Sequence, residues 1–295
     1  MRVVIVAQLQ YDNIRFETAG LSSGFGVEHQ CMCMPVSMLS EPTLILDFKP
    51  DLILLYKCLS DVKHIKTLTK AKVFCFYPHY EQHLLREVIE LASYVDVLFI
   101  SNSNKDLWQA YKQAGIKDIQ FFTVGVDIDI FKPQAIECKF DFGIFQNDVH
   151  DPEVEWQRDL IYQGTARCYK FCFCGTGWDM KGTYITKHIP VCGEQLSKLF
   201  AQCNYILHLN DFDVPRWEIL LSVMACNIPI VSTPFNHMQD LDVLIFEQHS
   251  FWPEVKDLLN TSPTICNTRP SIINLHTWDK RAQQLLNQYD LPQCS

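Results

Sequence analysis

Short apolar runs alternate with amphipathic stretches along the chain, and this alternation limits the fold more than any other feature. The runs are rich in Val, Ile and Phe, which is typical of strands buried on both faces of a parallel sheet. Strand–helix–strand repetition predicts right-handed crossovers and a doubly wound α/β sheet. We expect Asn104 to cap one helix and Gly115 to end it. In the first half, the expected strands are residues 2–8, 51–57, 71–78, 96–102 and 119–125, and the expected helices are 80–95 and 104–115.

The pattern starts again near residue 140, so we expect two similar α/β domains. A chain of 295 residues is long enough to bury two cores of ordinary size. The predicted boundary lies near Phe131–Glu137, which gives an N-terminal domain of residues 1–135 and a C-terminal domain of residues 136–295. In the second half, the expected strands are 140–147, 168–175, 205–210 and 228–233, and the expected helices are 151–166, 193–203, 216–226 and 277–289.

Composition narrows the class of protein. The formal net charge of −9 argues against a broad surface for nucleic acid or anionic membrane. The first apolar run breaks at Gln8 and holds a single basic residue, which is typical of a buried strand and not of a signal peptide. No apolar stretch approaches the length of a transmembrane helix, so we expect a cytoplasmic protein.

The chain has thirteen cysteines, and the pattern C-x-C occurs at Cys31/Cys33 and at Cys172/Cys174. The second pair is expected to lie on one face of a strand. Two explanations are open, namely reduced cysteines in the core of a cytosolic protein or a zinc site. The spacings match none of the usual structural zinc patterns, so we assign no metal site.

Four segments, taken in order, resemble retaining GT-B glycosyltransferases of the family-4-like group. Residues 124–133 resemble the segment that closes the first domain of these enzymes, and residues 191–213 resemble their base-binding loop with the following helix and strand. Residues 224–233, MACNIPIVST, resemble the enzymes' later segment MACGIPVV. Residues 276–286 resemble a late helix of the spore-maturation branch. The order and spacing of these segments carry the resemblance.

This resemblance implies two Rossmann-like domains that face each other across a cleft. It implies that residues 140–235 bind a nucleotide diphosphate sugar and that the N-terminal domain receives the acceptor. The acceptor would be a glycan, a lipid-linked molecule or a protein. The late helix from Thr277 would cross back to the first domain. The nucleotide sugar is a substrate in this scheme, so no cofactor is expected.

The donor diphosphate is expected at the carboxyl ends of the C-terminal strands, where helix N-termini offer unpaired N–H groups. Val191 lies in the segment that resembles the base-binding loop. Gly175 and Gly177 either leave room for a ligand close to the backbone or form a plain turn. Together with Val191, the donor candidates in the segments after these strands are Asn147, Gly175, Gly177, Trp178 and Asn210.

In the family pattern, a glutamate that holds the ribose stands five residues before the glycine of MACG. In this chain Ser222 and Asn227 occupy those two places, and Val214 stands where the partner acid would be. The paired-glutamate motif is therefore not intact. Glu218 lies one turn before Ser222 on the same helix face, nearer to the expected phosphates. It either accepts hydrogen bonds from the ribose hydroxyls, with Ser222 assisting, or is a solvated glutamate favoured by the helix dipole.

Basic side chains are few in this region. Arg216 is the main candidate to offset the charge of the leaving diphosphate, and its alternative role is that of a surface arginine. Arg158 and Lys181 are the candidates for the cationic pair that retaining GT-B enzymes place on the diphosphate. Arg158 could equally face water on its helix.

Asp211 and Asp213 form an Asp-x-Asp triplet, which the other large glycosyltransferase fold uses to hold a divalent metal. That fold is built on one sheet, with the motif after its first nucleotide-binding half. In this chain the triplet follows a strand deep in the second half. The alternative is that Asp213 caps the following helix. We therefore expect a site without a metal.

The N-terminal domain offers fewer candidates. The segment 8–30 follows the first strand, is rich in Gly, Ser and Asn, and contains Asp12. Ser101 stands at another expected strand end. His79 follows a strand end at the place where retaining GT-B enzymes often hold a histidine against the donor sugar. It is either such a residue or a structural histidine.

The sequence therefore predicts a retaining, hexosyltransferase-like glycosyltransferase with His79, Arg216 and Glu218 as its catalytic candidates. In such a reaction the leaving diphosphate oxygen can take the acceptor proton, so the protein contributes positioning and electrostatic stabilisation. Two alternatives stay open. One is a degenerate GT-B protein that binds nucleotide or glycan without turnover, and the other is a sugar-nucleotide epimerase on the same fold.

Overall fold

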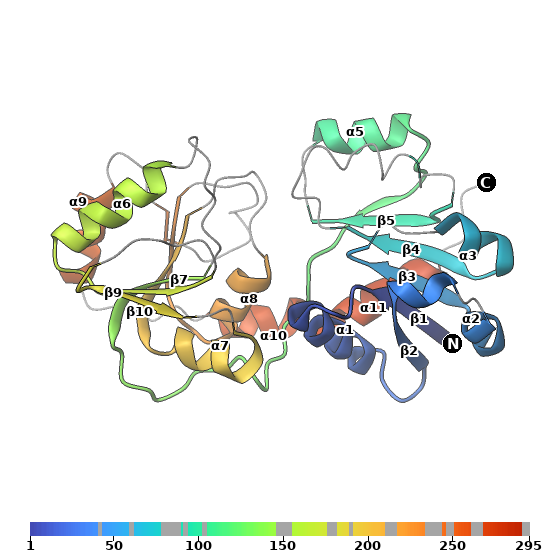
Figure 1. Cartoon of the computed structure of the whole chain (residues 1–295), viewed down its shortest axis with the longest axis horizontal. Helices are drawn as coiled ribbons and strands as arrows, with labels where there is room; N and C mark the ends of the chain where they lie inside the picture. Colours follow the sequence, from blue (N-terminus) through green and yellow to red (C-terminus); the bar gives the residue numbers. More distant parts are fainter. Residues whose placement is uncertain are drawn as a thin grey trace. The chain divides into compact units, whose positions relative to one another are not determined.

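The computed structural model contains two compact units, and the chain passes between them twice (Figure 1). Unit 1 comprises Met1–Gly125 and His276–Ser295, and unit 2 comprises Val126–Leu275. The sequence placed one boundary near Phe131–Glu137, whereas the units divide after Gly125 and after Leu275. The structure describes residues 1–40, 43–58, 62–77, 90, 94–101, 105–145, 155–175, 182–188, 191–209, 217–233, 244–245, 251–260 and 268–290.

Unit 1 is built on a six-stranded parallel sheet with the order β2-β1-β3-β4-β5-β6. Every residue of the central strand β3 is buried, as expected for a strand covered on both faces. The five strands predicted from the apolar runs are all present, each shorter than predicted. The strands are β1 (Arg2–Ala7), β2 (Gln30–Pro35), β3 (Leu52–Tyr56), β4 (Lys72–Phe76), β5 (Val97–Ile100) and β6 (Ile119–Phe121).

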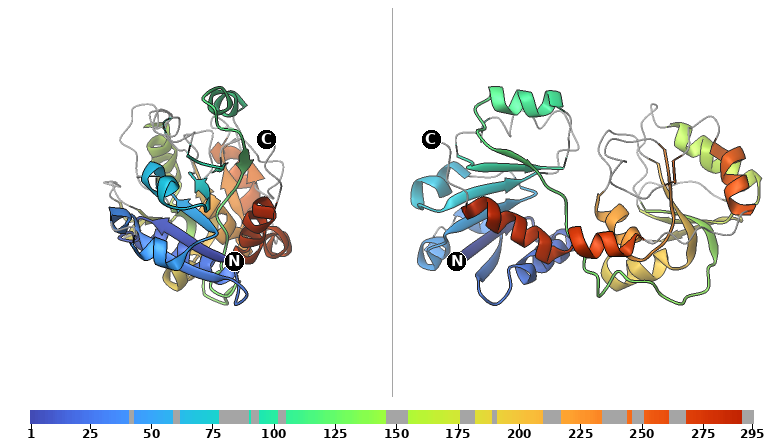
Figure 2. Two further views of the ribbon diagram at one scale, coloured as in Figure 1. Left: turned by 90° about the vertical axis from the view of Figure 1, so that its right-hand side faces the viewer. Right: turned by 180° about the vertical axis from the view of Figure 1, so that it is seen from behind.

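Helices cover both faces of this sheet. Side chains from η1, α2, α3 and α5 pack with Val4, Val6, Ile53 and Leu55 in one core cluster. On the other face α1 packs against α11 (Figure 2). Within the described residues, the helices of unit 1 are α1 (Asp12–Gly24), η1 (Val36–Ser40), α2 (Thr43–Phe48), α3 (Val62–Leu68), α5 (Lys105–Gln113) and α11 (Trp278–Asp290).

Gly115 ends helix α5 as predicted. Its φ is +99°, which lies in the left-handed region that glycine adopts readily, and its N–H donates to the carbonyl of Lys112 at 3.0 Å. The N–H of Ile116 donates to the carbonyl of Tyr111 at 3.1 Å. Asn104 and most of the helix predicted at 80–95 lie outside the described residues.

The pattern of apolar residues did not predict α1 or β2. Helix α1 contains small residues because it lies very close to Trp278 of α11. A Cβ added to Gly20 would collide with the indole, and a Cβ added to Gly24 would lie 2.5 Å from the carbonyl oxygen of Trp278. Strand β2 is an edge strand in which only Met34 is buried, so it lacks the apolar signal of a central strand.

Unit 2 is a second six-stranded parallel sheet with the order β12-β11-β10-β7-β8-β9. Four of its strands were predicted, whereas the exposed edge strand β9 and the two-residue β12 were not. The strands are β7 (Phe140–Ile144), β8 (Phe171–Cys174), β9 (Ile185–His188), β10 (Cys203–His208), β11 (Ile230–Ser232) and β12 (Leu244–Ile245).

Helices also lie on both faces of the second sheet (Figure 1). On one face Trp252 of α9 donates from its indole N–H to the carbonyl of Leu160 in α6 at 2.7 Å, which joins the two helices. On the other face α8 contacts α7 and α10. The sequence did not predict α9 or α10. The helices of unit 2 are α6 (Glu155–Ala166), α7 (Gly193–Phe200), α8 (Trp217–Ala225), α9 (Phe251–Asn260) and α10 (Arg269–Leu275).

Arg281 of α11 is a buried cation in unit 1, with only 9% of its surface exposed. It donates to the carbonyl of Val124 at 3.3 Å, to Thr123 Oγ1 and to Gln284 Oε1 at 3.1 Å. Its Nη2 also lies 2.6 Å from Nδ1 of His276. An arginine stays protonated, so Nδ1 of His276 must accept this bond and the imidazole must be neutral. Burial, and then the Arg281 charge, lower the pKa of His276 to about 4.

This neutral histidine makes the stability of unit 1 depend on pH. An unfolded histidine has a pKa near 6.5, so between pH 6.5 and 4 the unfolded chain binds a proton that the folded chain does not. The contribution of the neutral histidine to the free energy of unfolding is fully present above pH 6.5 and is lost as the pH is lowered towards 4. We expect the wild type to lose about 2–3 kcal/mol over this window relative to His276→Gln. Urea denaturation across the pH range measures the difference, and parallel curves for both proteins would contradict it.

Candidate functional site

The order of the strands fixes where each unit is expected to bind a ligand. In unit 2 the chain runs from β7 outwards through β8 and β9, and then returns to place β10 on the other side of β7. In unit 1 the same reversal occurs at β1, with β2 on one side and β3 on the other. Ligands of open α/β sheets bind beyond the carboxyl ends of the strands at such a reversal. The candidate positions are therefore the ends of β7 and β10 and the ends of β1 and β3.

Several predicted site residues fall on segments that the structure does not describe. The segments that follow β7 and β10 are among them. The predicted residues outside the described ones are His79, Asn147, Gly177, Trp178, Lys181, Asn210, Asp211, Asp213 and Arg216.

Glu218 lies in the first turn of α8, which begins just after the undescribed segment that follows β10. The residue is half-buried, and its Oε2 is a buried atom without a hydrogen-bond partner among the described residues. Buried carboxylate oxygens in native proteins nearly always have a partner. Oε2 of Glu218 is therefore an unused hydrogen-bond acceptor at the position predicted for the nucleotide sugar. A ligand or a neighbouring segment must satisfy it.

Ser222 lies on the same helix as Glu218, as predicted, four residues later. It is buried, with 5% of its surface exposed, within a run of α8 residues that pack into the core. A side chain at position 222 therefore has less access to a ligand than Glu218.

Asn227 stands where the segment that the sequence resembles has a glycine. Its φ is +57°, in the left-handed region, directly after the end of α8. Asparagine is one of the few other residues that adopt this conformation readily. Its Oδ1 also accepts the backbone N–H of Arg269 at 3.0 Å.

Arg269 caps the C-terminal end of α8. Its Nη1 donates to the carbonyls of Ala225 at 2.5 Å and Phe131 at 2.7 Å, and its Nη2 donates to the carbonyl of Ile128 at 2.8 Å. A cation in this place satisfies end-of-helix carbonyls and favours the negative end of the helix dipole. The contact also holds the segment that opens unit 2 against the helix that carries Glu218.

Sequence reasoning missed a set of buried polar contacts at the ends of β10 and β11. Ser232 Oγ donates its single proton to the carbonyl of His208 at 2.9 Å or of Thr233 at 2.7 Å. Nδ1 of His208 lies 3.2 Å from the same hydroxyl, so this nitrogen is assigned as the protonated one and donates to Ser232. Gln157 of α6 donates to the carbonyl of Leu209 at 3.4 Å. These bonds fix the strand ends next to α8, and their only sequence signal was polar residues at the ends of apolar runs.

Gly175 and Val191, two predicted donor contacts, come together at the end of β8. The backbone of Val191 bonds the thiol of Cys174, the residue before Gly175. Burial raises the pKa of the Cys174 thiol, and this backbone bond opposes the rise. Gly175 and Val191 are each half-buried. Arg158 is half-buried in the N-terminal part of α6, beside Gln157.

The cysteines of the two C-x-C patterns are free thiols. Cys172 and Cys174 are buried in β8, whereas Cys31 and Cys33 lie on the edge strand β2. Within the part of the chain that the structure describes, no group of three or more His, Cys, Asp or Glu residues could hold a metal ion.

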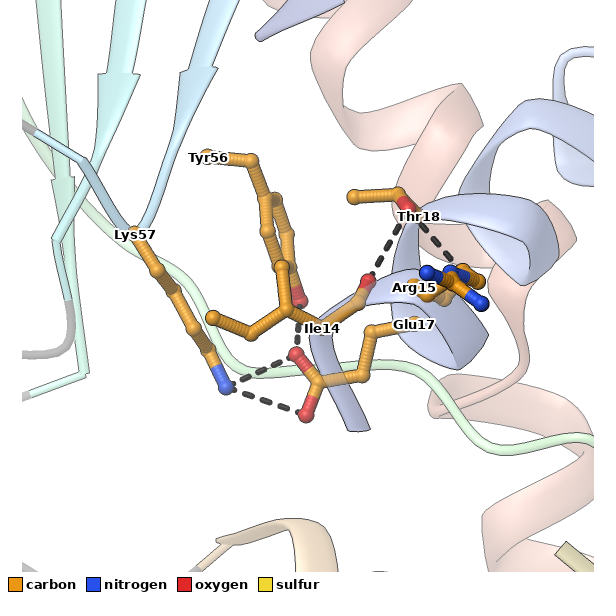
Figure 3. A network of polar contacts seen from close by, with 6 residues as sticks. All are labelled: Ile14, Arg15, Glu17, Thr18, Tyr56 and Lys57. Atoms are coloured by element: carbon orange, nitrogen blue, oxygen red, sulfur yellow. Dashed lines mark hydrogen bonds and ion pairs between the residues drawn. The ribbon is translucent and has the colours of Figure 1, made fainter. Parts of the chain in front are cut away.

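In unit 1, Asp12 begins α1 and Ser101 is buried at the end of β5. The candidate ligand position of this unit is at the ends of β1 and β3. A network that the sequence did not predict lies there, formed by Glu17, Tyr56 and Lys57 (Figure 3). Its members come from α1 and from the end of β3.

No protein-family model matches the chain, and no curated protein sequence matches it significantly. Solved structures match along nearly its whole length. HepE of Anabaena in complex with UDP and glucose has a TM-score of 0.73 at 10% identity, over 98% of this chain and 99% of that chain. Sucrose-phosphate synthase from Thermosynechococcus elongatus has a TM-score of 0.69 at 10% identity, over 98% of each chain.

An alpha-glucosyltransferase in complex with UDP and a mismatched 13-mer DNA has a TM-score of 0.70 at 11% identity, over 99% of this chain and 100% of that chain. At such identities the likeness shows the fold. The chain therefore has the GT-B fold of two Rossmann-like α/β domains, as the sequence resemblance implied. None of the described helices is both long enough and apolar enough to span a membrane.

The left-handed conformation of Asn227 gives a test of the resemblance at the end of α8. Asn227→Gly keeps this conformation at low cost but loses the bond to Arg269, so we expect a loss of at most about 1 kcal/mol. Asn227→Ala loses the bond and also places at positive φ a residue that, unlike glycine and asparagine, does not adopt this conformation readily, which costs about 1–2 kcal/mol more. Urea unfolding of both variants measures which of them has the lower free energy of unfolding. An alanine variant as stable as the glycine variant would contradict the role assigned to the backbone.

Proposed function

We propose that the chain is a retaining glycosyltransferase whose unit 2 binds a nucleotide diphosphate sugar. The observation that carries the proposal is the buried, unsatisfied Oε2 of Glu218 in the first turn of α8, beside the strand end where this fold is expected to bind its ligand. The structures of HepE and of the alpha-glucosyltransferase contain UDP, so UDP and UDP-glucose are the first ligands to test.

In this proposal Glu218 accepts hydrogen bonds from the ribose hydroxyls. Arg216, two residues earlier, offsets the charge that develops on the leaving diphosphate. The N–H groups of the first turn of α8 add further donors for the phosphates. Gly175 and Val191 line the nucleotide-sugar site on the side of β8. The transferred sugar keeps its anomeric configuration, and the diphosphate oxygen takes the acceptor proton.

The burial of Ser222 favours one competing function. A chain that lacks the family glutamate at this place could bind a nucleotide and not turn it over. A protein of that kind would bind UDP or UDP-glucose and show neither transfer nor hydrolysis. A sugar-nucleotide epimerase would instead convert the nucleotide sugar with no acceptor present.

Substitutions in the first turn of α8 test the donor site. We expect Arg216→Ala to weaken UDP binding by about 1.5–3 kcal/mol, the value of a hydrogen bond to a charged group. Glu218→Gln should weaken UDP-glucose binding by a similar order, because it replaces one acceptor oxygen with a donor. Isothermal titration calorimetry on the full chain measures both affinities.

Glu194→Gln is the matched control, since Glu194 is also a first-turn glutamate in unit 2 but leaves 76% of its side chain exposed beside Lys198. Its affinity should equal that of the wild type. Unchanged affinity in both Arg216→Ala and Glu218→Gln would move the donor site elsewhere.

The second test concerns metal. We propose that transfer needs no bound divalent ion, because the cationic residues and helix N–H groups offset the diphosphate charge. Activity should therefore survive treatment with EDTA. A loss of activity that magnesium or manganese restores would contradict this and would assign Asp211 and Asp213 as ligands.

A further inference from the structure

The edge strand β2 carries two thiols on the face that helix α1 covers. Cys31 and Cys33 are two residues apart on this strand, so their side chains point to the same side of the sheet. Helix α1 packs against β2, and the thiol of Cys33 donates to the carbonyl of Thr18 in α1 at 3.8 Å. Both cysteines are free thiols, with Cys31 half-buried and Cys33 exposed. The two thiols therefore lie together at the rim of the contact between α1 and β2, where small molecules have access.

Two hydrogen-bond donors meet at the sulfur of Cys31. The thiol of Cys33 and the side chain of Ser22 in α1 both bond to it. The carbonyl of Thr18 can only accept, so its contact with Cys33 requires Cys33 to keep its proton. Cys31 is therefore the member of the pair that ionises, and its thiolate accepts from Cys33 and Ser22.

These bonds favour the thiolate of Cys31. The bond from Cys33 lowers the pKa of Cys31 to about 7, burial opposes this change, and the bond from Ser22 adds to it. The same bond, burial and the Cys31 charge raise the pKa of Cys33. An ordinary thiol has a pKa of about 8.5, so at pH 7 about half of Cys31 is thiolate, against about 3% of an ordinary thiol. The thiolate is the form that attacks disulfides.

We propose that Cys31 is a site of reversible thiol modification that reacts with small disulfides of the glutathione class. The Cys31 thiolate attacks one sulfur of the disulfide and forms a new S–S bond, while the old S–S bond breaks and the other half leaves as a thiolate. The disulfide is the oxidant, because its leaving sulfur is reduced as Cys31 is oxidised. Cys33 is a positioning residue that holds the thiolate by its hydrogen bond. The site is separate from the proposed sugar transfer and does not depend on it.

The geometry of β2 favours a mixed disulfide over an internal bond between the two cysteines. Residues two apart on an extended strand have Cβ atoms about 6.6 Å apart, whereas a disulfide needs about 3.5–4.5 Å. The ladder with β1 pairs Cys31 with Val3 and Cys33 with Ile5, which keeps the strand extended through the pair. An internal disulfide would require β2 to leave this ladder.

Incubation of the reduced full chain with glutathione disulfide tests the proposal, and fragment-ion mass spectrometry measures the adduct on each cysteine against pH. We expect the rate at Cys31 to rise with a midpoint at pH about 7. Cys33→Ala removes a donor, so the midpoint should move up by about one pH unit or more, and the rate at pH 6 should fall about threefold or more. Cys33→Ser keeps a donor in the same place and should restore the wild-type midpoint.

Cys138 is the internal reference in every sample. It is exposed, and its thiol donates to the carbonyl of Ala201 at 3.8 Å, a contact like the one that Cys33 makes with Thr18. Its rate should be the same in the wild type and in both variants, and dithiothreitol should remove the adduct from Cys31. Equal Cys31 midpoints in the wild type and Cys33→Ala would overturn the proposal. An adduct at Cys33 in place of Cys31, or an internal disulfide without an adduct, would also overturn it.

Discussion

The packing of Trp278 against three glycines is the contact on which the first unit depends. Gly20 and Gly24 of α1 face it, and a Cβ on Gly125 would lie 2.6 Å from the indole. The contact joins the last helix of the chain to the first, so residues from both ends of the sequence share one core. Larger side chains at these glycines would force α11 away from α1, and overpacking of this kind costs about 1–3 kcal/mol.

The same contact helps to position the Glu17–Lys57 pair in two ways. Helix α1 carries Glu17, so the position of α1 against α11 sets the position of the carboxylate. Helix α11 also places Arg281 over the ring of Phe122, which belongs to an aromatic row that continues through Phe76 to Tyr56. Tyr56 holds the carboxylate of Glu17 at 2.8 Å. A helix from the far end of the chain therefore supports both Glu17, which pairs with Lys57, and Tyr56, which holds Glu17.

The sequence predicted those parts of the structure that depend on local pattern. Buried central strands such as β3 need continuous apolar runs, and the runs located them. Helix α1 was missed because its contact with Trp278 requires small residues, and the edge strands β2 and β9 were missed because an exposed edge needs no apolar run. In the proposed donor site, the placement of Glu218 and Ser222 on one helix followed from their spacing. The Glu17–Lys57 pair did not, because it joins residues 40 apart in sequence through strand register and through a positive φ that a lysine does not signal.

The two positions on and after α8 that depart from the resembled glycosyltransferase pattern have different physical consequences. Asn227 adopts the left-handed conformation that a glycine adopts readily, and this turn leads from α8 to β11. Ser222 does not preserve the carboxylate, and its burial leaves little room to satisfy one. A glutamate at 218 instead of 222 moves the carboxylate about 6 Å along the helix axis, towards the N-terminal N–H groups. If Glu218 holds the ribose, the nucleotide must be bound closer to the first turn of α8 than the family pattern requires, with ribose and diphosphate sharing that turn.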